Sequence, residues 1–169
     1  MIVPTSTGQI FVSDELSIKN DIAPTQQLDA DHPFVPFVKL FWDKITTPGT
    51  GDLLMDCYSM LHFGIDAVSE ASRQYVRTQL RRSPPDIVLI LNNVNQPLYR
   101  FHQRTAKVWH YICIDKETVD RWADLMEWLP NDYTTLALEA MLKTTIIHET
   151  GHWHYTLART KLSYWNELC

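Results

Sequence analysis

The chain contains the stretch Ile146-Ile147-His148-Glu149-Thr150-Gly151-His152-Trp153, an H-E-x-x-H array. On an α-helix, two histidines four residues apart lie one above the other on the same face. Their imidazoles can therefore bind one metal ion, at about 2.0–2.1 Å for zinc. Glu149 is rotated by about 100° from His148, so its carboxylate lies beside the metal and can act on a water molecule there. The stretch predicts a helix whose front carries a metal site.

The residues around this array predict a helix with one buried side. At 3.6 residues per turn, an apolar stripe lies roughly opposite the two histidines, and it consists of Leu142, Ile146, Trp153 and Leu157. The front continues with a mixed set of residues, namely Met141, Thr144, Thr145, Tyr155 and Arg159. Gly151 costs about 1 kcal/mol relative to alanine inside a helix, so we expect a close packing neighbour beside it.

The first half of the chain reads as irregular structure followed by helices. Residues 1–32 are expected to be irregular, with one short strand at 9–12. The apolar run 37–42 predicts a short helix, and the Pro- and Gly-containing run 46–51 predicts a loop. From 52 to about 82 the spacing predicts one helix. Its expected inward residues are Leu53, Leu54, Cys57, Leu61, Ile65, Val68 and Val76.

The second half predicts a small sheet and two further helices. Residues 87–91, 98–103 and 107–114 read as strands because they are rich in β-branched and aromatic residues. Asp115 is a good N-cap for a helix that continues through Trp128, and the motif helix should follow from about Tyr133 to Arg159. The chain is therefore expected to be α+β, with N-terminal helices, a small mixed sheet and a long motif helix.

Composition limits the class of protein. A length of 169 residues fits one domain, 1–169, in which residues 1–50 are either an extension such as a propeptide or part of the fold. The net charge of −5 argues against a nucleic-acid partner and against binding to an acidic membrane surface. No signal peptide or membrane-spanning run is visible, so the cytoplasm is the default expectation. Three scattered cysteines form no disulfide framework.

A sheet followed by a helix bearing H-E-x-x-H resembles the zincins, a large class of zinc metallopeptidases. The resemblance covers chiefly residues 133–159 and the order of elements from about 86 onward. It implies Zn²⁺ bound by His148 and His152, Glu149 as general base, and a peptide or protein substrate. It also implies that the last strand, 107–114, lies along the cleft and pairs with the substrate backbone.

The third zinc ligand separates the zincin subfamilies. The metzincin pattern fails, because Tyr155 stands where its glycine should be and Ala158 where its histidine should be. Glutamate-using zincins place an Asn-Glu pair on a later helix, which makes Glu167 of Asn166-Glu167 the leading candidate. The fourteen residues 153–166 that separate it from His152 are about one helical turn fewer than in those families. Either the site is compact, or the C-terminus is truncated and the ligand lies elsewhere.

Other residues stay open as members of the site. His110 and His102, on predicted strands, are alternative third ligands. Tyr155 is the first candidate to stabilise the oxyanion formed during hydrolysis. His154 points away from the two motif histidines, which predicts a solvent-facing or stacking role. The alternative function is a catalytically inactive, zincin-derived binding or structural protein with an incomplete metal site.

Overall fold

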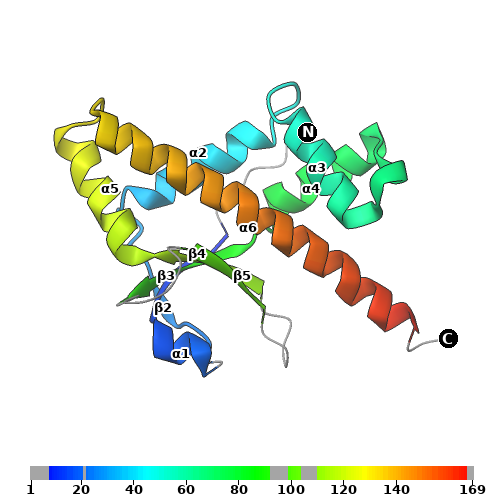
Figure 1. Cartoon of the computed structure of the whole chain (residues 1–169), viewed down its shortest axis with the longest axis horizontal. Helices are drawn as coiled ribbons and strands as arrows, with labels where there is room; N and C mark the ends of the chain where they lie inside the picture. Colours follow the sequence, from blue (N-terminus) through cyan, green and yellow to red (C-terminus); the bar gives the residue numbers. More distant parts are fainter. Residues whose placement is uncertain (1–7, 21, 92–98, 104–109, 167–169) are drawn as a thin grey trace.

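The computed structural model describes residues 8–20, 22–91, 99–103 and 110–166, with the backbone alone at 19, 99–103, 110 and 159–166. In these residues helices cover a mixed five-stranded sheet, and the longest helix crosses over it (Figure 1). The expected α+β architecture, with a small mixed sheet and a long C-terminal helix, is confirmed. Within these ranges, no helix is both long and apolar enough to traverse a bilayer.

The first segment is more ordered than the sequence suggests. Strand β1 (Ile10–Asp14) confirms the predicted strand, whereas helix α1 (Glu15–Lys19) and the short strand β2 (Gln26–Gln27) are not predicted. Asp14 explains the helix, because its carboxylate accepts hydrogen bonds from the backbone N–H of Ser17 at 2.8 Å and from the Ser17 hydroxyl at 2.6 Å. It is therefore an N-cap placed directly at the end of a strand.

Helix α2 (Phe34–Ile45) extends three residues beyond the predicted 37–42 at each end. Pro36 does not stop it, because the first turn of a helix has no intrahelical acceptor for its N–H groups. The buried side of α2 consists of Phe34, Val38, Phe41, Trp42 and Ile45.

The single helix predicted over 52–82 is wrong. The structure has two helices, α3 (Asp52–Phe63) and α4 (Glu70–Arg82). Gly64 separates them, with a φ of 97° that side-chain-bearing residues rarely adopt. Ser69 then caps α4 by accepting a hydrogen bond from a backbone N–H of the first turn at 3.2 Å.

The break changes which side chains are buried. Leu53, Leu61 and Ile65 were expected to face inward but are 79%, 41% and 74% exposed. Ile65 belongs to the 3₁₀ turn η1 (Ile65–Ala67), which bends away from the core. Val76 is fully buried, as expected.

The three predicted strands of the second half are confirmed as β3 (Asp86–Leu91), β4 (Tyr99–Gln103) and β5 (His110–Asp115). The sheet order is β2-β1-β3-β5-β4. Strands β1, β3 and β5 are parallel, and the edge strands β2 and β4 are antiparallel to their neighbours. The last strand in the chain, β5, is therefore an interior strand.

Both faces of the sheet are apolar, and successive residues alternate between them. The residues facing the main core include Ile87, Leu89, Ile112 and Ile114. The opposite face carries Val88, Ile90, Tyr111 and Cys113, which pack with Ile18 of α1. A sheet buried on both faces accounts for the nearly continuous apolar run of β3.

Helix α5 (Lys116–Trp128) begins as predicted, because the Asp115 carboxylate accepts hydrogen bonds from the N–H and hydroxyl of Thr118 at 2.8 and 2.7 Å. Helix α6 (Tyr133–Asn166) begins at the predicted residue and continues seven residues past the predicted end. The predicted apolar stripe of α6 is confirmed in the core, with Leu142, Ile146 and Trp153 buried and Leu157 partly buried. Thr145, predicted for the front, is 3% exposed and belongs to the buried side.

A buried arginine joins α3 to α4. The Arg77 side chain is 4% exposed, and its guanidinium donates to Glu70 at 3.1 Å and to Asp52 of α3. The two carboxylates are largely hydrated, since their side chains are 72% and 45% exposed. The buried guanidinium therefore depends on this pair of acceptors.

We predict that Arg77→Ala lowers the free energy of unfolding by about 2–3 kcal/mol. The loss stays in this range because the freed carboxylates return to water. Urea denaturation checks the value, and Arg82→Ala on the exposed side of the same helix is the control. Equal stability losses in the two variants would contradict the prediction.

Candidate metal centre

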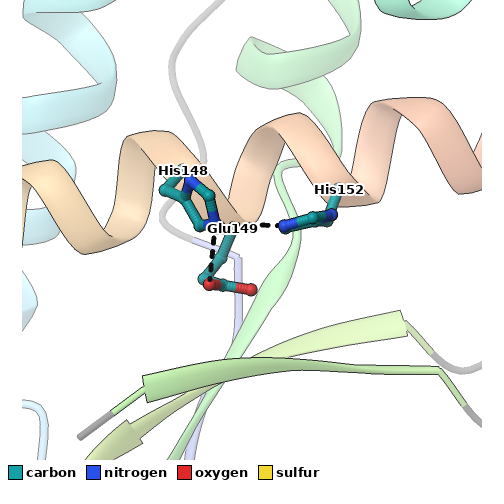
Figure 2. Close-up of side chains that lie close together, drawn as sticks. All are labelled: His148, Glu149 and His152. Carbon is teal, nitrogen blue, oxygen red and sulfur yellow. Dashed lines mark hydrogen bonds and ion pairs between the residues drawn. The ribbon is translucent and has the colours of Figure 1, made fainter. Parts of the chain in front are cut away.

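Helix α6 presents His148 and His152 side by side, as the array predicts. Their Nε2 atoms lie 3.1 Å apart (Figure 2). Two nitrogen ligands of a tetrahedral zinc at about 2.0–2.1 Å lie about 3.3 Å apart. The imidazoles are thus close to the separation that a shared zinc ion requires.

Glu149 completes the cluster from the buried side. Its side chain is 5% exposed, whereas that of His148 is 61% exposed, and its Oε1 lies 3.8 Å from Nε2 of His148. One ligand atom from each of His148, Glu149 and His152 can be chosen so that all lie within 4.8 Å of one another. Figure 2 shows the two imidazoles beside α6 and the Glu149 carboxylate directed toward strands that pass beneath the helix.

The turn that carries the histidines is fixed by side-chain hydrogen bonds. The Tyr58 hydroxyl of α3 donates to the Ile147 carbonyl at 2.9 Å, and the Thr150 hydroxyl donates to the Ile146 carbonyl at 2.6 Å. Tyr58 is 2% exposed, and burial raises the pKa of its phenol above the usual range. The tyrosine is therefore a neutral donor that ties α3 to the residue before His148.

The sequence pattern does not single out Tyr58. It is one of several aromatic residues in the first half of the chain, and its partner lies 89 residues away. Only the packing of α3 on α6 reveals the contact. No local signal of spacing or charge could have identified it.

The neighbour expected beside Gly151 is present but leaves room. A Cβ atom added at Gly151 would lie 3.4 Å from Leu61 Cδ1 and 3.9 Å from Tyr58 Cε1, both ordinary van der Waals distances. The helical backbone is also compatible with alanine, because Gly151 is not among the glycines with a positive φ. Close packing therefore does not require glycine here.

His154 stacks, and it is not exposed. Its ring lies 4.9 Å from that of Tyr58 and 5.9 Å from that of His62, and the residue is 0% exposed. Within the described part of the chain neither ring nitrogen of His154 has a hydrogen-bond partner. Burial, with a smaller contribution from His62, lowers the pKa of His154 to about 3. The stacking role is confirmed, the solvent-facing one is wrong, and the residue is not part of the cluster.

Among the side chains that the structure describes, the only group of three or more residues that could hold a metal ion consists of the three motif residues, so none of the other described side chains is brought to the cluster as a further ligand. Glu167 lies outside the described residues. Helix α6 continues from His152 to Asn166, a rise of about 21 Å along its axis. A ligand role for Glu167 therefore requires the chain to leave this helix after His152. Tyr155, one turn beyond His152 on the same face, is 42% exposed.

The strand register distinguishes the two alternative histidines by position. His110 stands opposite Gln103 and shares its face of the strand with Ile112 and Ile114, which belong to the core on the α6 side. His102 stands opposite Tyr111, which belongs to the other face. Position 110 is thus on the face of the sheet that α6 covers, and position 102 is not.

The expectation that strand 107–114 pairs with a substrate backbone is wrong. Strand β5, the described part of the predicted 107–114, pairs with β3 on one side and β4 on the other. Its backbone groups are therefore already used in the sheet. The edge strand on this side is β4 (Tyr99–Gln103), which contacts α6.

We predict that Gly151→Ala stabilises the protein by up to about 1 kcal/mol, because alanine favours the helix and a methyl group fits. For a chain of this size the melting temperature should rise by about 2–4 °C. Gly64→Ala is the control, because its φ of 97° is unfavourable for alanine and stability should fall. A lower melting temperature for Gly151→Ala would mean that Leu61 cannot accommodate the methyl group.

We predict that His154→Leu removes a pH-dependent loss of stability. Below about pH 6.5 the unfolded chain binds a proton at His154, whereas the folded protein does not until about pH 3. The wild type therefore loses up to about 1.4 kcal/mol per pH unit across this window, and above it the loss is absent. Thermal unfolding between pH 7 and pH 4, with a metal chelator present, should show the variant's advantage growing as pH falls. Parallel curves would contradict this.

No family model, curated protein or solved structure matches this chain, so the interpretation of the cluster depends on its geometry.

Proposed function

We propose that this protein is a zinc-dependent peptidase that hydrolyses peptide bonds in a peptide or protein substrate. The observation that carries the proposal is the cluster itself: two Nε2 atoms 3.1 Å apart with a buried carboxylate next to them. A core helix with two incidental histidines would not be expected to bury a carboxylate beside exposed imidazoles. Here His148 and His152 are exposed, whereas the Glu149 side chain, whose charge favours water, is only 5% exposed.

His148 and His152 would hold the zinc. Imidazole nitrogen is a preferred zinc donor, and the spacing of the pair fits a tetrahedral site. When bound, zinc supplies Lewis acidity, which polarises a carbonyl and lowers the pKa of a water to about 7. Accessible imidazoles leave room for a substrate on the outer side of the pair.

Glu149 would move the proton. Its carboxylate accepts a proton from the attacking water and delivers it to the leaving amine, so one group acts as base and then as acid. Burial on the sheet side of the histidines limits the orientations open to the carboxylate. Tyr155, whose side chain follows the histidines along the front of α6, is a candidate donor to the oxyanion.

The edge strand β4 would bind the substrate backbone. It is antiparallel to β5 and pairs on one side only among the described residues. An extended peptide can add to such an edge through main-chain hydrogen bonds. Because β4 contacts α6, a peptide added there would run next to the helix that carries the cluster.

A second candidate function is a binding or structural protein that holds metal weakly and hydrolyses nothing. One observation favours it: α6 continues as a helix to Asn166 and does not turn back toward the cluster. Two histidines without a third protein ligand bind zinc less tightly than a complete catalytic site.

Elemental analysis and a protease assay on an unfolded protein substrate test the proposal. We expect one zinc per chain in the wild type and none in His148→Ala. Glu149→Gln should keep the zinc and lose activity by a factor of about 10²–10⁴, because the ligands remain and the proton acceptor does not. Activity retained in Glu149→Gln would overturn the proposal. Zinc binding without hydrolysis in the wild type would favour the second candidate.

The same measurement identifies the third ligand. His110→Ala and His102→Ala are a matched pair, because the two positions lie on opposite faces of the sheet. Zinc loss in His110→Ala alone would assign that residue, and loss in Glu167→Ala alone would mean that α6 ends early when metal binds. Zinc loss in His102→Ala with retention in His110→Ala would contradict the role of the α6-facing side.

A further inference from the structure

The turn between α5 and α6 exposes four large apolar side chains within nine residues. Trp128 and Leu129 follow one another at the end of α5, and Tyr133 and Leu136 begin α6; they are 75%, 53%, 84% and 50% exposed. We call these four residues the aromatic corner. Figure 1 shows that the α5–α6 turn lies at the end of α6 remote from the C-terminus.

The aromatic corner has a fixed backbone. The Leu129 N–H donates to the Leu125 carbonyl at 2.7 Å, and the Asp132 N–H donates to the Leu129 carbonyl at 3.1 Å. The buried Thr135 hydroxyl donates to the same Leu129 carbonyl at 2.8 Å. A surface whose backbone is already ordered loses little entropy when it binds a partner.

The charges in the stretch of chain that forms the corner have one sign, and the nearest cations along the two helices are Arg121 and Lys143. Residues 124–139 contain four carboxylates and no lysine, arginine or histidine. Glu139 pairs with Lys143, and Asp132 accepts a hydrogen bond from the Thr134 N–H at 2.9 Å. Asp124 and Glu127 are exposed in the last turn of α5 before Trp128. Aromatic faces and carboxylates together favour a cation, above all the guanidinium of arginine, which stacks on rings and pairs with carboxylates.

We propose that the aromatic corner binds a segment of a partner protein that carries arginine or lysine beside apolar side chains. Tryptophan and tyrosine are the residue types that contribute most to binding energy at interfaces. A second copy of this chain does not fit, because two acidic corners would repel each other, and an anionic membrane is disfavoured for the same reason. About 22 Å of helix separates Tyr133 from His148, so the surface is independent of the proposed metal site.

Fluorescence anisotropy with labelled model peptides tests this proposal. The probe is a helical peptide of about fourteen residues built from leucine and arginine, and its partner probe has glutamate in place of arginine. We expect the full chain to bind the arginine peptide at least about tenfold more tightly than the glutamate peptide. Trp128→Ser with Tyr133→Ser should weaken binding by at least about tenfold, and so should Asp124→Lys with Glu127→Lys.

Leu53→Ser is the matched control, since Leu53 is 79% exposed on α3 and lies outside the corner. It should bind the arginine peptide as the wild type does. All variants should unfold at the wild-type temperature, because each change is at an exposed side chain. Undiminished binding by Trp128→Ser with Tyr133→Ser, or equal binding of both peptides, would overturn the proposal. Self-association through the corner, or adsorption to phosphatidylcholine vesicles without peptide binding, would overturn it as well.

Discussion

Helix α6 must be buried on one side and open on the other, and most of the structure follows from that requirement. Its apolar stripe supplies Leu142, Ile146 and Trp153 to the core, so α6 cannot rotate without exposing them. The same constraint directs His148 and His152 outward, because they lie on the other side of the same cylinder. The site is therefore oriented by hydrophobic burial, and the hydrogen bond from Tyr58 adds a fixed point next to the first histidine.

The His-Glu-His cluster and the elements of the fold follow from short-range signals. The four-residue spacing of the histidines, the N-cap at Asp115 and the alternation of the strands are each contained in a few neighbouring residues. These signals predict the type of nearly every helix and strand from residue 34 onward. They fail at Gly64, where one glycine outweighs a helical pattern that continues on both sides of it.

What sequence reasoning misses depends on contacts between distant segments. The position of β5 inside the sheet follows from its pairing with both β3 and β4, which no local pattern encodes. Burial of His154 arises from the packing of α3, whose aromatic rings surround it. The third ligand of the proposed zinc site belongs to the same class of problem, because such a ligand would come from a segment that only the tertiary fold brings to the helix.

The interior position of β5 also affects how the chain can assemble. During synthesis β3 emerges before β4 and β5 and can pair with β1, which is already present, but β4 has no partner until β5 follows. Strand β5 must then enter between two segments that precede it, which makes its contacts with β3 non-local and slow to form. A nascent chain that ends before residue 110 therefore exposes the apolar edge of β3. Such an unpaired edge can aggregate with other chains unless a chaperone binds it first.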